Sequence, residues 1–96
     1  MNNNNLGFVN NTEYLRGFNE LYQTIYNDAY NKLLSRGKLL PEEYKEYYDK
    51  GEQIITSNKD NSSYCYGVID GIKKAIDIAQ SDYEREFYSN PDVTRH

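Results

Sequence analysis

The one cysteine and the one histidine of this 96-residue chain give little support for catalysis. The single cysteine, Cys65, lies on the apolar side of a helical pattern, where a thiol packs more often than it reacts, and the single histidine, His96, is the last residue. A nucleophilic cysteine needs a base beside it, which His96 is poorly placed to supply. The chain also lacks the Cys and His spacing of a metal site. We therefore expect a protein that is not an enzyme and that uses neither a metal nor another cofactor.

A second kind of chemistry is anion binding by the N-termini of two helices. Hydroxyl and amide side chains and one lysine lie at the starts of two long apolar patterns, with tyrosines close by. If both helices start at the same end of a bundle, their backbone N–H groups can hold an anion and the tyrosines can stack on a base. Ordinary helix caps and a solvated loop account for the same residues. The candidates for a nucleotide-like ligand are Asn11, Thr12, Tyr14, Lys59, Ser62, Ser63, Tyr64 and Tyr66.

The elements that must position these groups are helices, because apolar residues recur at steps of three and four along three segments. The first segment starts at Asn11 or Thr12, either of which can cap a helix, and ends at Gly37. Pro41 suits the first position of the second helix, and the polar run at 57–63 ends it.

The third segment starts at Asn61 or Ser62 and ends before an Asn-Pro pair. We expect an all-α fold, an antiparallel bundle of two long helices and one short one, occupying residues 11–89. Residues 1–10 are predicted to be a flexible N-terminal arm and 90–96 a loose C-terminal tail.

Gly67 and Gly71 lie four residues apart in the third helix, although each costs about 1 kcal/mol relative to alanine. Small residues at this spacing let two helix backbones approach closely. We predict that this line accepts another helix, of the same chain or of a partner, while approach of a ligand and mere tolerance of the glycines remain alternatives. The residues expected in helix packing or an oligomer interface are Leu15, Phe18, Tyr22, Gly67, Gly71, Ala75, Ala79 and Tyr83.

The expected helices differ in length, and this predicts self-association. Two helices of about 25 residues cannot both be covered by one of about 15 residues, which is shorter by roughly 15 Å. Large uncovered apolar patches usually mark interfaces. We therefore expect a dimer or a larger homo-oligomer to complete the bundle.

Composition narrows the range of partners and locations. The net charge of −4 disfavours nucleic acid and anionic membranes as partners. Apolar runs stay well below the roughly 20 residues that cross a bilayer. A lone cysteine and the lack of a secretory signal predict a cytoplasmic protein, in the host cytoplasm if a phage encodes it.

The restart at residues 40–43, Leu-Pro-Glu-Glu, and a spaced motif in the third helix resemble small helical proteins of unknown function from Firmicutes and their phages. The resemblance covers residues 12–80. It implies a helical hairpin or bundle from a mobile element and transfers no active site. The motif consists of Tyr66, Gly71, Ala75 and Ile76.

Three functions follow as hypotheses. The first is a non-enzymatic phage or mobile-element factor that antagonises a host defence system by stoichiometric binding of a protein partner. The second is an oligomer that sequesters a small anionic nucleotide signal at helix N-termini. The third is a small helical transcriptional regulator, which the acidic balance and the lack of a basic recognition helix disfavour.

Overall fold

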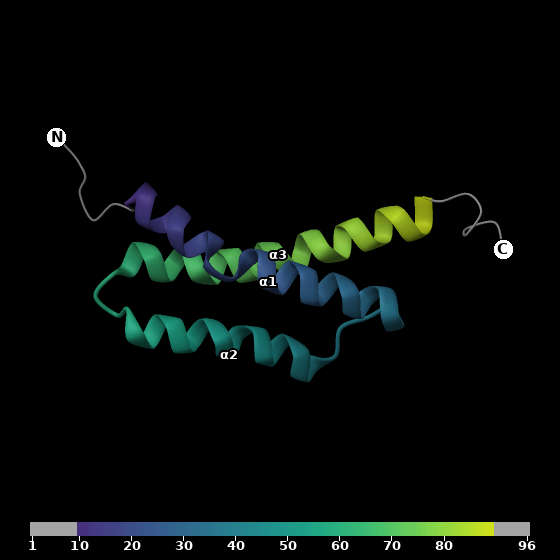
Figure 1. The fold of residues 1–96 in the computed structure, drawn as a ribbon, viewed down its shortest axis with the longest axis horizontal. Helices are drawn as coiled ribbons and strands as arrows, with labels where there is room; N and C mark the ends of the chain where they lie inside the picture. Colours follow the sequence, from purple (N-terminus) through teal and green to yellow (C-terminus); the bar gives the residue numbers. More distant parts are fainter. Residues whose placement is uncertain (1–9, 90–96) are drawn as a thin grey trace.

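The computed structural model describes residues 10–89, which form three α-helices joined by short turns (Figure 1). α1 spans Asn11–Arg36, α2 spans Pro41–Ser57 and α3 spans Ser62–Ser89. These residues contain no strand. The all-α, three-helix prediction is therefore confirmed, with helices of 26, 17 and 28 residues. The predicted arm, apart from Asn10, and the predicted tail with His96 lie outside the described residues.

The chain runs up, down and up, so α2 is antiparallel to both long helices and α1 and α3 are parallel (Figure 1). α1 crosses α3 at a shallow angle in that view. The contact between α1 and α3 is by far the most extensive in the molecule, and α2 packs mainly on α3. The parallel pair is thus the centre of the fold, and α2 supports it from one side.

The crossing of α1 and α3 is closed by glycines on both helices. A Cβ atom at Gly67 would overlap the carbonyl oxygen of Tyr14, and one at Gly71 would overlap that of Phe18. Gly17 on α1 faces the carbonyl oxygen of Tyr64 in the same way. The line of small residues on α3 therefore packs against α1 of the same chain. This close backbone packing offsets the low helix propensity of glycine.

Apolar side chains spaced four residues apart along each helix continue the core beyond the point where α1 crosses α3. Along α3 the small row continues as Ala75 and Ala79, both fully buried. Rows at this spacing on both helices are the ridges that interlock when two helices pack. No polar or charged residue is buried among residues 10–87, for which the structure describes side chains. The buried hydrophobic residues are Ile25, Ala29, Leu33, Leu39, Tyr47, Tyr64, Val68, Ile72, Ala75, Ile76 and Ala79.

The N-terminus of α1 corrects the predicted cap. Asn10 is the N-cap, and its Oδ1 accepts a hydrogen bond from the N–H of Glu13 at 3.1 Å, whereas Asn11 is already helical. Asparagines at 10 and 11 are equally able to cap a helix. The backbone N–H of Asn10 also donates to Ser63 Oγ at 2.8 Å, and this contact with α3 favours Asn10.

The turn between α1 and α2 forms as its sequence predicts. Gly37 has φ 84° and donates its N–H to the carbonyl of Leu33 at 2.7 Å, which closes the C-terminus of α1. Pro41 begins α2. Glu43 accepts a hydrogen bond from the N–H of Leu40 at 2.8 Å and pairs with Arg36, so one carboxylate joins both helix ends.

Candidate functional site

Five aromatic residues form a continuous row along α1, which we call the aromatic row. Successive ring centroids are 6.3, 5.5, 6.3 and 5.8 Å apart, and the last three pairs are stacked. All five side chains are half-buried, so each ring exposes part of its surface. Contacts of this kind add stability beyond area burial. The row consists of Tyr14, Phe18, Tyr22, Tyr26 and Tyr30.

Three tyrosines of this row donate hydrogen bonds to carboxylates on α3. In each pair the acceptor lies 56 residues after the donor, and each distance is 2.6 Å. A constant offset means that the parallel helices keep one register over four turns, because both rise equally per residue. The pairs are Tyr14 with Asp70, Tyr26 with Asp82, and Tyr30 with Glu86.

In the pair of Tyr26 and Asp82 the pKa values of both partners are shifted. The hydrogen bond to Asp82, with some burial, raises the pKa of Tyr26 to about 12. The same bond, together with Arg85, holds the pKa of Asp82 below its usual value. The hydroxyl therefore stays protonated and the carboxylate ionised at neutral pH, which keeps the hydrogen bond charge-assisted and the ring fixed.

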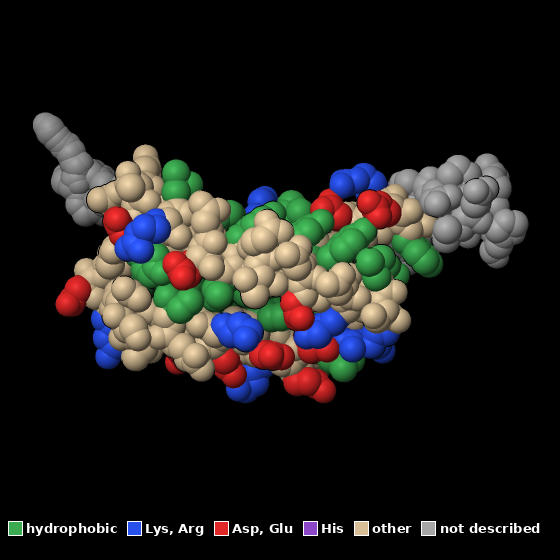
Figure 2. Space-filling model, in the orientation of Figure 1, with side chains coloured by type: hydrophobic (Ala, Val, Ile, Leu, Met, Phe, Trp, Pro, Cys, Tyr) green, Lys and Arg blue, Asp and Glu red, His purple; other side chains and the backbone are tan. Residues whose placement is uncertain are grey.

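A row of exposed uncharged residues lies beside the aromatic row on α1. Asn27 accepts a hydrogen bond from Gln23 at 3.1 Å, and Leu15 in the same row is 56% exposed. We call the two rows together the aromatic–amide face. Figure 2 shows many charged side chains gathered along the lower edge, over α2, with hydrophobic and uncharged surface above them. The second row is Asn11, Leu15, Asn19, Gln23, Asn27 and Asn31.

The N-termini of α1 and α3 do meet, as the anion-site hypothesis requires, but a carboxylate already lies between them. Glu13 accepts hydrogen bonds from Arg16 and, at 2.7 Å, from the side chain of Asn61. These bonds lower the pKa of Glu13, so it is negatively charged. A negative charge at this end interacts favourably with both helix dipoles. The predicted place for a ligand anion is therefore next to an existing anion.

The predicted anion-site residues have other partners or lie apart on the surface. Tyr64 is only 4% exposed, donates to Glu20 at 2.7 Å and has the guanidinium of Arg16 over its ring at 4.3 Å. Tyr66 is 61% exposed. Ser63 accepts from Asn10, and Tyr14 donates to Asp70. The others are exposed: Asn11, Thr12, Lys59 and Ser62.

The predicted interface residues mostly pack within the chain. The four small residues Gly67, Gly71, Ala75 and Ala79 are buried between α1 and α3. Leu15 is exposed. The remaining three, Phe18, Tyr22 and Tyr83, are half-buried. Packing within the chain accounts for the small residues, and the oligomer stays a prediction that rests on exposed and half-buried side chains.

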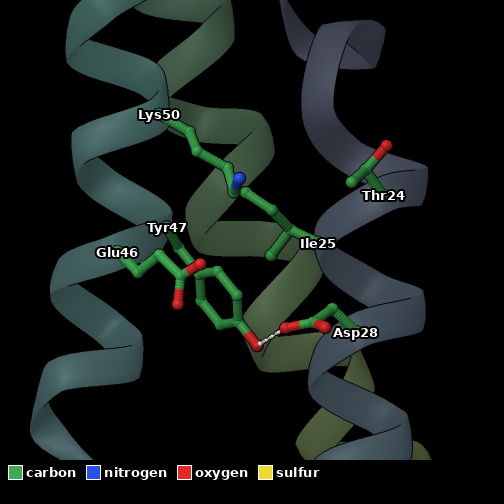
Figure 3. A pocket seen from close by; sticks show the side chains of 6 residues that line it. All are labelled: Thr24, Ile25, Asp28, Glu46, Tyr47 and Lys50. Atoms are coloured by element: carbon green, nitrogen blue, oxygen red, sulfur yellow. Dashed lines mark hydrogen bonds between the residues drawn. The ribbon is translucent and has the colours of Figure 1, made fainter.

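A cleft between α1 and α2 contains the main polar link between these helices (Figure 3). The Tyr47 ring lies between the helices and its hydroxyl donates to Asp28 at 2.6 Å, while Lys32 donates to Asp28 at 2.7 Å. Burial and Asp28 raise the pKa of Tyr47. Burial opposes ionisation of Asp28, but the hydrogen bonds from Lys32 and Tyr47 outweigh it and lower its pKa.

The size of this cleft fits a structural role. Its volume is about 140 Å³, whereas pockets for small molecules are typically about 300–1,000 Å³. Its wall is lined by Thr24, Ile25, Asp28, Glu46, Tyr47 and Lys50. We interpret the polar side chains in this cleft as a structural contact that holds α2 against α1.

The thiol of Cys65 makes a structural contact. It is half-buried and donates to the carbonyl oxygen of Asn58 at 3.2 Å, which ties the start of α3 to the preceding turn. Residues 10–89 contain no group of three or more His, Cys, Asp or Glu side chains placed to hold a metal ion. Within the same range, no helix combines the length and the apolarity that crossing a membrane demands.

No protein-family model, curated protein or solved structure matches this chain. The resemblance to Firmicutes and phage proteins therefore stays a prediction. The features that carry the functional argument are those of the chain itself.

Sequence reasoning missed the tyrosine–carboxylate pairs and the amide row. A signal for the pairs was present, because Asp70, Asp82 and Glu86 are spaced by multiples of four, as are the tyrosines of α1. Only the parallel register of α1 and α3 brings the two sets together.

Proposed function

We propose that this chain is a non-enzymatic binding protein that occupies a protein partner stoichiometrically, with the aromatic–amide face as the contact surface. The observation that carries the proposal is the row of five half-buried rings beside a row of exposed amides. Tyrosine supplies large contact area and asparagine adaptable hydrogen bonding, which is the composition of many binding surfaces.

Preorganisation supports this role. Ordering side chains at an interface costs about 0.5–1.5 kcal/mol for each flexible side chain. Tyr14, Tyr26 and Tyr30 are already held by hydrogen bonds to α3, and stacking holds their neighbours. The aromatic row therefore loses little freedom on binding.

The identity of the partner follows from the resemblance alone. We keep as a prediction that the partner belongs to a host defence system antagonised by a phage or mobile-element factor, and that the protein is cytoplasmic. Self-association through uncovered parts of the long helices is the second element of the proposal. Leu15 on α1 and Phe87 on α3, 56% and 42% exposed, are candidate contacts.

No specific observation favours the two other functions. Glu13 lies where a nucleotide phosphate would have to bind, which weighs against a nucleotide-sequestering role. The exposed face of α1 carries amides rather than a row of basic residues, which weighs against a transcriptional regulator.

The test compares two matched glutamine substitutions. Gln23→Arg places a charge on the aromatic–amide face, whereas Gln53→Arg places the same charge on α2, and both positions are exposed. Affinity capture from host lysate with the wild type and both variants, followed by native mass spectrometry, identifies a complex and its stoichiometry. The proposal is supported if the wild type and Gln53→Arg capture a complex of defined stoichiometry and Gln23→Arg does not. Capture that is the same with all three baits contradicts it.

A further inference from the structure

A second surface, a groove between α2 and α3, has different chemistry from the aromatic–amide face. Its volume is about 250 Å³, and three of its six lining residues are isoleucines, contributed by both helices. Gly51 brings the helices together there, because a Cβ at this position would overlap the Cδ1 of Ile72. The lining residues are Tyr48, Gly51, Glu52, Ile55, Ile69 and Ile72.

The side chains that line the groove from α2 and α3 leave it open to solvent. Tyr48 is 37% exposed, and Ile55 and Ile69 are half-buried. Of the three isoleucines that line the groove, Ile72 alone is fully buried, with an exposed fraction of 1%. The groove is therefore a shallow apolar slot rather than a closed cavity, and it is smaller than a typical small-molecule site.

The charge around the groove is predominantly negative. Glu52 lines it, and Asp77 on α3 lies close enough to Tyr48 to contribute, after burial, to the raised pKa of that hydroxyl. Of the five carboxylates on α2, Glu43 pairs with Arg36 of α1 and Glu46 lines the α1–α2 cleft, so these two lie away from the groove, and Asp49 is paired with Lys45. Lys73, one turn after Ile69 on α3, is a cation on the same side. The excess of negative charge thus comes from α2.

We propose that this groove binds an amphipathic helix of a partner protein, which inserts apolar side chains between α2 and α3 and places lysine or arginine residues against α2. Apolar anchors at helical spacing are the usual way in which a groove recognises a helix. Charge complementarity determines the sign of the flanking residues. A second copy of this chain is a poorer match, because its α2 carries the same excess of acids.

The experiment uses fluorescence anisotropy with the full chain. The probe is a fluorescein-labelled peptide with leucines at positions i, i+3 and i+7 flanked by lysines, and the control peptide has glutamates in place of the lysines. We expect the lysine peptide to bind and the glutamate peptide to bind at least about tenfold more weakly. Added salt should weaken binding of the lysine peptide, since the flanking contacts are exposed.

Matched variants locate the binding. Glu52→Lys should weaken the lysine peptide several-fold, whereas Glu46→Lys, the same change on the α1 side of α2, should have little effect. Lys73→Glu should strengthen binding. Ile69→Asn should weaken it about tenfold or more. Tyr48→Ala repeats the apolar test at a more exposed position in case Ile69→Asn impairs folding, which circular dichroism reports.

Three results would overturn the proposal. One is failure of the lysine peptide to bind, or equal binding of both peptides. Another is binding that neither Ile69→Asn nor Tyr48→Ala weakens. The third is a dimer by light scattering that these two variants dissociate, because a second copy would then occupy the groove. The Gln23→Arg test reports on another face, so it succeeds or fails independently.

Discussion

At the residue scale, the glycines of the α1–α3 crossing determine how closely the two helices approach. Gly67 and Gly71 bring α3 against the backbone of α1, and Gly17 does the same from the α1 side. Any side chain at these positions must push backbone atoms apart, because the nearest atoms are carbonyl oxygens rather than flexible side-chain ends. These residues therefore tolerate less change than most of the apolar core.

Gly67→Ala tests this packing, because the change in stability that we expect is opposite in sign to the change that helix propensity alone would cause. In an exposed helix interior the change would stabilise by about 1 kcal/mol. Here we expect a loss of about 3 kcal/mol in the free energy of unfolding, since the new methyl group overlaps the carbonyl of Tyr14. Urea denaturation measures it. Ser81→Ala, at an exposed position of the same helix, is the control and should change stability by less than about 0.5 kcal/mol. A stabilised Gly67→Ala would contradict the structure.

The pair of Tyr26 and Asp82 provides a second test at this scale. Tyr26→Phe removes the hydroxyl that donates to Asp82 and should cost about 1–2 kcal/mol. A double-mutant cycle with Asp82→Asn should give a coupling energy of about 1 kcal/mol. Tyr22→Phe is a suitable comparison, since Tyr22 belongs to the same row. Additive effects of the two substitutions would show that the pair does not interact in solution.

At the element scale, short polar contacts fix where each helix begins and ends. Glu43 serves both α1 and α2, because it accepts the N–H of Leu40 and pairs with Arg36 and Lys32. The hydrogen bond from Leu40, followed by the Arg36 pair, lowers the pKa of Glu43. The position of α2 relative to α1 depends on this one carboxylate and on the Tyr47–Asp28 contact.

Substitution of two adjacent glutamates separates this contact from the effect of charge at a helix N-terminus. Glu42 and Glu43 both lie in the first turn of α2, so both interact with the helix dipole. Only Glu43 caps Leu40 and pairs with α1. We expect Glu43→Ala to lower the free energy of unfolding by about 2 kcal/mol and Glu42→Ala by about 0.5 kcal/mol or less. Equal losses in thermal or urea unfolding would disprove the special role of Glu43.

At the scale of the whole molecule, the short helix α2 covers the pair of long helices α1 and α3 from one side only. α2 is nine residues shorter than α1, at 17 against 26, and packs mainly on α3. The exposed large hydrophobic residues are therefore spread over all three helices: Leu15, Leu34, Tyr48, Tyr66 and Phe87.

Size-exclusion chromatography with light scattering tests self-association. We expect a dimer or larger assembly, because the uncovered turns of α1 and α3 carry exposed apolar residues. Leu15→Asp should weaken the assembly without reducing the stability of the fold, since Leu15 is 56% exposed. A strict monomer at high protein concentration would remove the argument from helix length.

The tyrosines also predict how stability depends on pH. Tyrosine ionises near 10.0 when unperturbed, whereas the hydrogen bond to Asp82 raises the pKa of Tyr26 to about 12, and burial with Glu20 raises that of Tyr64 to about 12. Because the pKa is higher in the folded state, the protonated hydroxyls stabilise the fold below pH 10. We expect this stabilisation to be lost as the pH rises from about 10 to about 12.

Two carboxylates make the stability of the fold depend on pH in the opposite sense at low pH. The pKa values of Glu13 and Asp82 are lowered by their hydrogen bonds, to Arg16 and Asn61 and to Tyr26 respectively, so their contribution is lost as the pH falls through those values. Urea denaturation across the pH range, with tyrosinate absorbance, measures both limbs. In Tyr26→Phe the alkaline loss should be smaller. An alkaline limb unchanged by that variant would contradict the raised pKa of Tyr26.

The sequence by itself determined the three helices and most of their ends, because these depend on neighbours in the chain. Apolar spacing predicted the helices, and Gly37 and Pro41 predicted the first turn. For the cap of α3 the sequence left Asn61 and Ser62 open, and in the structure Asn61 Oδ1 accepts the N–H of Tyr64. It also identified Gly67 and Gly71 as a packing site. These are local choices of backbone conformation and helix propensity.

Only the tertiary structure decided which surfaces meet. It placed α1 of the same chain in the glycine groove, chose Asn10 over Asn11 as the cap through Ser63, and aligned the tyrosines of α1 with carboxylates 56 residues later. It also put Glu13 between the two helix N-termini. Helical periodicity specifies an apolar side but not its partner, because the partner depends on the relative register of helices far apart in the chain.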